Sequence, residues 1–287
     1  MNKPPWLVVK VKHKNKITQI KKVLDASNLH TVCEEALCPN IGECWNKKSV
    51  TFMILGDICT RNCSFCAVTT GKPKPPDLME PSNIANMVQK LNLNHVVITS
   101  VDRDDLEDNG ASHFVNTVNN IKTANPNTTI EVLIPDFIGY HNGVKQIVES
   151  KPDIINHNIE TISRLHSKVK PKSNYFHSLN LLKTAKKLNN EIFTKSGIIL
   201  GLGETETEII TLMKDLLSVN CDILTIGQYL QPSFKHPEVV EYVAPKQFKE
   251  YKKIGESLGF KFVASGPFVR SSYNASEVYN IINKNNS

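Results

Sequence analysis

The chain of 287 residues is 40% hydrophobic and 22% charged, which is typical of a globular protein that buries a full core without disulfides. Its net charge of +6 favours an ordinary solvated surface, with a surface that attracts an acidic partner as the alternative. Aromatic residues do not alternate with the lysines, so we expect no nucleic-acid partner. No apolar run approaches the roughly 18 residues of a membrane span, and the basic N-terminus lacks the apolar core of a secretory signal, so we expect no membrane association.

From about residue 51 to residue 230, short apolar segments that predict strands alternate with longer segments that predict helices. The predicted strands are Thr51–Leu55, His95–Ser100, Thr129–Ile134, Asp153–Ile159, Glu191–Leu200 and Asp222–Gly227. The predicted helices are Ser82–Leu91, Ser112–Ala124, Asn142–Ser150, Tyr175–Leu188 and Glu204–Val219. Ser82, which follows Pro81, is the predicted N-cap of the first helix. Further on, we expect a helix at Pro245–Leu258, which Gly259 ends, and a last strand at Phe260–Ala264.

Strands that alternate with helices predict an α/β protein with a parallel sheet and right-handed connections. Six such units without a dinucleotide-type glycine loop favour a partial (β/α)6 TIM-like barrel over a Rossmann sheet. We expect an N-terminal extension (1–50), the barrel (51–230) and a C-terminal extension (231–287), with the chemistry at the carboxyl ends of the strands. The segment 201–203 (Gly-Leu-Gly) either cradles a phosphate or cofactor or forms only a turn.

The cysteines are the most informative residues of the chain. Six of the seven form two sets of three between residues 33 and 66, whereas Cys221 begins an apolar strand and is expected to be a buried hydrophobe. The set nearer the barrel is Cys59, Cys63 and Cys66, on the loop after the first predicted strand. Three thiolates on one short loop can bind three irons of a 4Fe-4S cluster and leave the fourth iron open. An open coordination position is where a metal site binds a substrate or cofactor.

The other set, Cys33, Cys38 and Cys44, supplies three more soft ligands over a short span. A zinc site usually has four ligands in paired spacing. No histidine lies near Cys59, Cys63 and Cys66, although Cys44 could be the fourth ligand of a zinc site with these three. An odd number of cysteines in a chain of this size argues against a disulfide framework. The two sets therefore favour iron–sulfur clusters, with a structural zinc site as the alternative.

The spacing Cys-x3-Cys-x2-Cys at 59–66 resembles the motif of the radical S-adenosylmethionine superfamily, and Cys-x4-Cys-x5-Cys at 33–44 resembles that of its lipoyl synthase family. The similarity extends from about Cys33 to Ala275, and the joint pattern is highly specific. It includes Thr-Ser-Val-Asp-Arg-Asp-Asp-Leu at 99–106, Asn-His-Asn-Ile-Glu-Thr at 156–161, Thr-Lys-Ser-Gly-Ile-Ile-Leu-Gly-Leu-Gly-Glu at 194–204, Gly-Gln-Tyr-Leu-Gln-Pro at 227–232 and Arg-Ser-Ser-Tyr at 270–273.

The resemblance implies that Cys59, Cys63 and Cys66 hold a catalytic 4Fe-4S cluster whose open iron is chelated by S-adenosylmethionine. One electron then yields a 5′-deoxyadenosyl radical that removes hydrogen from unactivated C–H bonds. The implied reaction inserts sulfur at C6 and C8 of an octanoyl chain on a lysine of a carrier protein. Expected carriers are the lipoyl domains of 2-oxoacid dehydrogenase complexes or the glycine cleavage H protein. The expected electron donor is ferredoxin or flavodoxin, and the expected location is the cytoplasm, with an organellar stroma as the alternative.

By the same resemblance, Cys33, Cys38 and Cys44 hold an auxiliary 4Fe-4S cluster that serves as the sulfur source, and a serine of the segment 270–273 completes it. We favour Ser272, as a catalytic ligand, over Ser271. A serine oxygen is a poor partner for iron beside three thiolates, so this corner would be labile, which suits a cluster that is consumed. Without the resemblance, the two serines would be read as an ordinary polar turn.

Polar residues near the ends of the fourth and fifth strands are the candidates for binding S-adenosylmethionine. Asn158 and Glu160 would contact its ribose or amino group, and Lys195 and Ser196 its carboxylate. Each is a weak signal, because such residues commonly bond to the local backbone, and the segment 103–105 (Arg-Asp-Asp) would equally form a structural ion-pair cluster. Two other functions stay open: a radical enzyme that inserts sulfur into another substrate, and a non-enzymatic zinc or iron–sulfur binding module.

Overall fold

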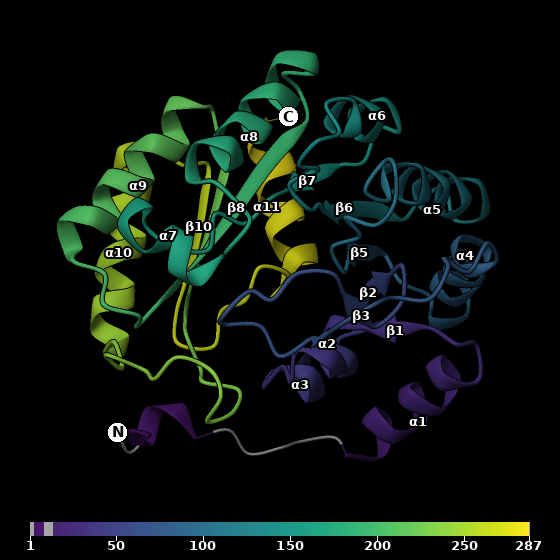
Figure 1. Ribbon diagram of the computed structural model, residues 1–287, viewed down its shortest axis with the longest axis horizontal. Coiled ribbons are helices and arrows are strands. Elements are labelled where there is room, and N and C mark those ends of the chain that lie inside the picture. The colour runs from purple at the N-terminus through teal and green to yellow at the C-terminus, as the bar shows by residue number, and fades with distance from the viewer. Residues whose placement is uncertain (1–2, 9–13, 287) are drawn as a thin grey trace.

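The computed structural model describes residues 3–8 and 14–286, and an eight-stranded sheet forms its centre (Figure 1). The strand order is β1-β2-β5-β6-β7-β8-β9-β10. Strands β2 to β10 run parallel, and the short β1 joins β2 antiparallel at one edge. Because β1 and β10 are the two edges, the barrel is open, which confirms the predicted partial (β/α) barrel.

Most predicted segments are confirmed to within two residues at each end. The strands are β1 (His30–Thr31), β2 (Thr51–Ile54), β5 (His95–Ser100), β6 (Thr129–Leu133), β7 (Ile154–Asn156), β8 (Phe193–Leu200), β9 (Ile223–Gln228) and β10 (Phe262–Ser265), with β3 (Ile58–Cys59) and β4 (Thr69–Thr70) in a separate pair. The helices are η1 (Pro5–Leu7), α1 (Lys14–Asp25), α2 (Val32–Glu35), α3 (Ile41–Asn46), α4 (Glu80–Leu91), α5 (Ala111–Ala124), α6 (Gly143–Glu149), α7 (Ser163–Val169), α8 (Tyr175–Leu188), α9 (Glu206–Ser218), α10 (Pro245–Leu258) and α11 (Ala275–Asn286). Strand β7 differs most, because it ends three residues before the predicted Ile159.

Local chemistry explains where several helices begin and end. Gly259 ends α10 as predicted, in the left-handed conformation (φ 118°) that glycine adopts without a steric penalty. The prediction that Ser82 caps α4 is wrong. The helix already begins at Glu80, with Pro81 in its first turn, where a missing N–H costs nothing, and the Ser82 hydroxyl donates to the Met79 carbonyl.

Helices α1, α2, α3, α7 and α11 were not predicted as elements. Helix α11 packs at the amino ends of the strands, where the ring of Tyr279 contacts His95 and Phe193 and its hydroxyl donates to Asp153 Oδ1 at 3.1 Å. Helix α1 is rich in lysine, and only a narrow apolar stripe, which includes Ile20, packs on the core. Such short or mostly polar helices owe their stability to tertiary packing, so the local pattern predicts them poorly.

The N-terminal extension shares its core with the barrel. Leu24 and the indole of Trp45 are fully buried in the same hydrophobic cluster as Phe52 and Ile54 of β2. The extension is therefore packed onto the β2 side of the barrel, and the division of the chain into three segments stays a prediction from the sequence.

His157 gives the fold a defined acid sensitivity. Its ring is buried, Nδ1–H donates to the Ile134 carbonyl at 3.0 Å, and Nε2 accepts from the Ser178 hydroxyl at 3.0 Å. Burial lowers the pKa of His157 to about 3, whereas an unfolded histidine titrates near 6.5. The unfolded chain thus takes up a proton first as the pH falls, so this stability is complete above about pH 6.5 and is lost as the pH falls toward about 3.

We therefore expect His157→Gln to remove part of the acid sensitivity of the apoprotein. Between about pH 7 and about pH 5, the stability advantage of the parent over the variant should shrink by about 2 kcal/mol. Anaerobic urea unfolding at both pH values measures this difference. An advantage that stays the same at the two pH values would show that His157 is not the group responsible.

Candidate functional site

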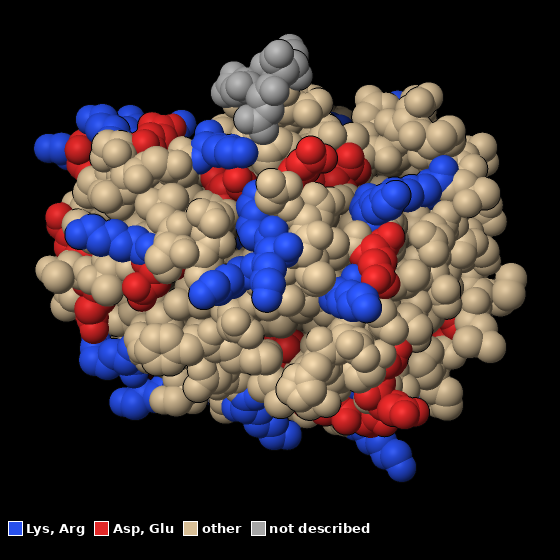
Figure 2. Space-filling view, turned by 90° about the horizontal axis from the view of Figure 1, so that it is seen from above, with Lys and Arg blue, Asp and Glu red and all other residues tan. Residues whose placement is uncertain are grey.

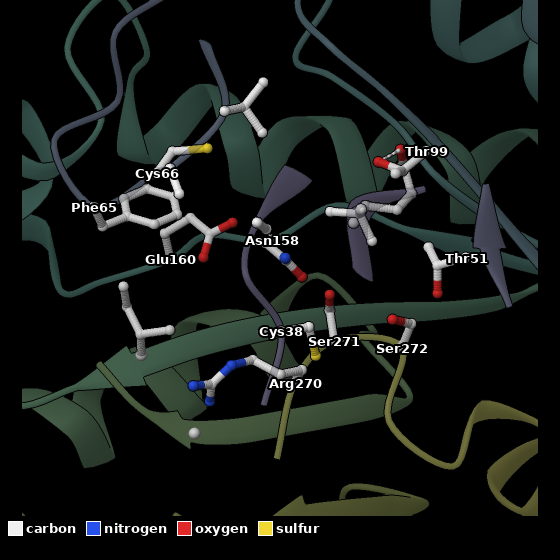
Figure 3. A pocket seen from close by; sticks show the side chains of 18 of the residues that line it. Cys38, Thr51, Phe65, Cys66, Thr99, Asn158, Glu160, Arg270, Ser271 and Ser272 are labelled. Atoms are coloured by element: carbon white, nitrogen blue, oxygen red, sulfur yellow. Dashed lines mark hydrogen bonds between the residues drawn. The ribbon is translucent and has the colours of Figure 1, made fainter. Parts of the chain in front are cut away.

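A cavity of about 540 Å³ opens at the carboxyl ends of the strands. Both cysteine sets line it, together with Asn158, Glu160, Ser271 and Ser272. In Figure 3, Cys66 and Glu160 lie on one side, and Cys38, Ser271 and Ser272 lie on the other. Two sets that are separate in sequence therefore share one chamber.

The loop with Cys59, Cys63 and Cys66 is fixed at both ends. Strands β3 and β4 pair beside Cys59, and the backbone N–H of Ser64 donates to the Val169 carbonyl after α7. The N–H groups of Arg61 and Asp102 point at Cys59 Sγ, at 3.4 and 3.3 Å, and such donors stabilise a thiolate. Burial raises the pKa of Cys63 to about 12 and that of Cys66 to about 11, so these thiols hold their protons until a metal displaces them.

Arg61, inside this loop, is a residue that the sequence analysis missed. Its buried guanidinium donates to both oxygens of Asp104, at 2.6 to 3.0 Å, and to Asp136 Oδ1 at 2.6 Å. These carboxylates follow β5 and β6, so Arg61 ties the cysteine loop to two barrel strands. The position of Arg61 between two cysteines of the motif is the sequence feature that could have identified it. Arg103 instead pairs with Asp105, which confirms an ion pair in the segment 103–105.

The first cysteine set (Cys33, Cys38 and Cys44) is assembled from the N-terminal extension. Cys33 lies in α2, Cys44 lies in α3, and Cys38 lies in the loop between these helices. Burial, together with the neighbouring thiols of the set, raises the pKa of Cys33 and of Cys44 to about 12. All six thiols are free, so the set presents unoxidised sulfur ligands at the cavity wall.

The loop that carries Ser271 and Ser272 is joined to the extension across the cavity. The side-chain amide of Asn40 donates to the Phe268 carbonyl at 2.6 Å, and the Tyr273 hydroxyl donates to Glu43 Oε1 at 3.1 Å. Residues more than 220 positions apart thus bring two serine hydroxyls to the chamber of the first cysteine set.

The side chains of Asn158 and Glu160 line the cavity, where they could contact a ligand. Glu160 has a positive φ of 68°, and its backbone N–H and carbonyl both form hydrogen bonds with β8. Burial raises the pKa of its carboxyl group, an effect that the charge of Lys170 and a hydrogen bond from Asn158 oppose. Asn158 Oδ1 is buried without a hydrogen-bond donor among the described residues. A buried polar atom without a partner is costly, so this oxygen is available for a bound molecule.

Lys195 and Ser196 do not line the cavity. Lys195 points into the barrel, fully buried, and donates to both oxygens of Glu131 at 2.9 Å. The Ser196 hydroxyl donates to the His157 carbonyl and accepts from the N–H of Ile159. The geometry therefore contradicts the expected contacts of both residues, because neighbouring strands had already taken their polar groups.

Lys170, at the end of α7, supplies a cation that the sequence analysis did not single out. It lines the cavity, and its charge acts on Cys63 and on Glu160. No carboxylate among the described residues forms an ion pair with it. Its ammonium group is therefore the cation available on this side of the chamber.

Two further expectations have outcomes, and two kinds of feature are absent from the described residues. Cys221 is buried at 2% exposure, which confirms the prediction of a buried hydrophobe. The segment 201–203 forms a turn, in which the N–H groups of Gly201 and Leu202 donate to Glu204 Oε2. In residues 3–8 and 14–286, no three His, Cys, Asp or Glu side chains come together around the position of a single metal ion. No helix in the same residues is long and apolar enough to cross a membrane.

Comparisons with known proteins agree with this geometry. A family profile described as the radical SAM superfamily matches residues 53–216. Lipoyl synthase of Caldanaerobacter subterraneus is 55% identical over 96% of both chains, and that of Caldicellulosiruptor saccharolyticus is 52% identical over 98% of both. The chain belongs to the lipoyl synthase family. Membership in this radical enzyme family gives it S-adenosylmethionine and 4Fe-4S clusters as cofactors.

Solved structures support the fold alone. Methylornithine synthase has a TM-score of 0.53 and 14% identity, over 79% of this chain and 62% of that one. Streptococcus suis SuiB bound to S-adenosylmethionine has a TM-score of 0.55 and 10% identity, over 76% of this chain and 50% of that one. The chain therefore spans one half to two thirds of these radical-enzyme structures, as expected for a partial barrel shared across a superfamily.

We predict that Arg61→Gln destabilises the cysteine loop more than the rest of the protein. Leaving the buried carboxylates without their cation should lower the free energy of unfolding by about 3 to 5 kcal/mol. After reconstitution, iron should fall from about eight to about four per chain, with the loss at Cys59, Cys63 and Cys66. Chemical denaturation and iron analysis measure both effects.

The matched control is Arg164→Gln, which breaks an exposed ion pair with Glu208 outside the cavity and should leave both readings unchanged. Equal iron contents of the Arg61 variant and the control would contradict the assigned role of Arg61.

Proposed function

We propose that the chain inserts two sulfur atoms at C6 and C8 of an octanoyl chain on the lysine of a lipoyl carrier domain. One observation supports this above all: two separate three-cysteine sets face a single cavity. A radical source and a sulfur source must both reach the same alkyl chain, and one chamber between the two sets satisfies this requirement.

On one side, Cys59, Cys63 and Cys66 would hold the cluster that binds S-adenosylmethionine. When bound, this pair supplies a 5′-deoxyadenosyl radical that abstracts hydrogen from an unactivated carbon. Asn158 Oδ1, which lacks a donor, would accept from the ribose or amino group, with Glu160 beside it. Lys170, rather than Lys195, would bind the carboxylate, because its ammonium group is unpaired and faces the cavity.

On the other side, Cys33, Cys38 and Cys44 would hold the auxiliary cluster, completed by Ser272. The bonds between Asn40 and Phe268 and between Glu43 and Tyr273 keep the serine loop beside the thiols. A hard oxygen ligand binds such iron weakly, so the fold rather than the metal bond holds this corner together. Apolar residues of the same cavity, such as Met53 and Ile198, would contact the octanoyl chain and exclude water.

The proposed partners are octanoylated carrier domains and a low-potential ferredoxin or flavodoxin, in a cytoplasmic setting. Figure 2 shows one face of the molecule, on which Lys and Arg side chains gather near the middle with Asp and Glu side chains among them. The net charge of +6 favours encounter with acidic carriers, and on this face opposite charges are interspersed.

An anaerobic assay tests this function. The reconstituted chain, with reductant, S-adenosylmethionine and an octanoyl-lysine peptide, should bind about eight irons and form 5′-deoxyadenosine. Mass spectrometry should show the peptide gaining two sulfurs. Product without sulfur would favour a radical enzyme for another substrate, and stoichiometric zinc in place of iron would favour a binding module.

Replacing Cys33, Cys38 and Cys44 with alanine should separate the two roles. We expect iron to fall to about four per chain, 5′-deoxyadenosine still to form, and sulfur insertion to be lost. The corresponding triple variant at Cys59, Cys63 and Cys66 should abolish 5′-deoxyadenosine instead. Unchanged iron after removal of the first set would exclude an auxiliary cluster there.

The two serines can be distinguished by paired variants. Ser272→Ala should reduce sulfur insertion at least about tenfold and change the electron paramagnetic resonance signal of the auxiliary cluster, whereas Ser271→Ala should change both little. The reverse result would assign the ligand to Ser271.

A further inference from the structure

Arg270 occupies a fixed position on the loop before the two serines. The N–H of Gly266 donates to the Ile226 carbonyl, and the N–H of Val269 donates to the Gly266 carbonyl, each at 3.0 Å. Together with the bond from Asn40 to Phe268, these contacts join the loop to the end of β9 and to the N-terminal extension. These hydrogen bonds therefore fix the position of the loop and, with it, of the Arg270 Cα atom.

Gly227 on β9 shows how closely the loop approaches the barrel. A Cβ at this position would overlap the Val269 carbonyl and lie 3.1 Å from Arg270 Nη1. The strand thus accommodates the loop only because residue 227 is glycine, and the guanidinium lies over the end of β9. Figure 3 shows the Arg270 side chain beginning beside Cys38, with its guanidinium pointing away from the Cys38 sulfur.

The guanidinium lacks a counter-ion. Its Nη1 donates to the Val269 carbonyl at 2.8 Å, and across the described ranges 3–8 and 14–286 no carboxylate forms an ion pair with it. A partly buried cation whose remaining N–H groups open into a cavity is stabilised by a bound anion. Among the cations that line the chamber, the charge of Lys170 acts on Cys63, whereas that of Arg270 acts on Cys38.

We propose that Arg270 is a positioning residue that holds the auxiliary cluster by balancing its negative charge. This rests on the proposed function, since it requires a cluster at Cys33, Cys38 and Cys44. Three thiolates and a serine oxygen leave a 4Fe-4S core with net negative charge, and Arg270 is the cation beside Cys38. When the weak serine corner opens, the charge of Arg270 keeps the remaining cluster against its three thiolates.

The test uses the full chain with Cys59, Cys63 and Cys66 replaced by alanine, so that iron reports the auxiliary cluster alone. In this background, Arg270→Gln should release iron to a chelator at least about tenfold faster, the effect of losing one charge-assisted hydrogen bond. Its reduction potential should become more negative, since a positive charge near the cluster is gone. Arg270→Lys should restore the potential, and Arg164→Gln, outside the cavity, should match the parent.

Several results would overturn this proposal. One is iron release and a potential in Arg270→Gln equal to those of the parent. Another is a fall in the Tm of the apoprotein for both Arg270 variants with an unchanged potential, which would assign Arg270 to loop stability. Weakened S-adenosylmethionine binding in the otherwise unmodified holoenzyme, with iron retention intact, would place Arg270 in the other half of the chamber. A parent that binds no iron at all in the triple-alanine background would refute the proposed function itself, and this inference with it.

Discussion

The structure depends on one constraint: the first cysteine set and the serine loop, which come from opposite ends of the chain, must meet at the mouth of an open barrel. The hydrogen bonds from Asn40 to Phe268 and from Tyr273 to Glu43 make this junction. Gly227 allows it, because a side chain there would collide with the loop. An open barrel serves this purpose, since its free edges β1 and β10 leave room at the mouth for both terminal segments.

Charge is arranged around the chamber in a consistent way. Buried cations that have carboxylate partners, Arg61 and Lys195, maintain the fold. Lys170 and Arg270, which have no such partner among the described residues, line the cavity, and their charges act on different cysteine sets. A charge is retained inside a protein only when an opposite charge offsets its desolvation, so the unpaired cations mark where anionic groups bind. The thiols follow the same principle, because burial keeps them protonated until iron replaces the proton.

The end of the barrel opposite the cavity is covered and packed. Helix α11 covers the amino ends of the strands, where Tyr279 packs on His95 and Phe193. The Glu131–Lys195 pair fills the barrel between this helix and the cavity. Lys195 and Glu131 thus satisfy each other deep in the barrel, whereas Asn158 at the cavity keeps a side-chain oxygen without a donor among the described residues.

The sequence by itself determined the order of strands and helices, the burial of Cys221 and the two cysteine sets, because apolar periodicity and ligand spacing are local properties that survive in any fold. Helices such as α1 and α11 escaped prediction, since their stability comes from the surfaces that they cover. Only the tertiary structure decided which polar residues are free. The sequence pointed to Lys195 as a ligand, yet Glu131, 64 residues away, occupies its ammonium group, and Lys170, which the sequence did not single out, lines the cavity. Hydrogen bonds between distant strands cannot be inferred from local spacing, and they separate the side chains that build the barrel from those left available for chemistry.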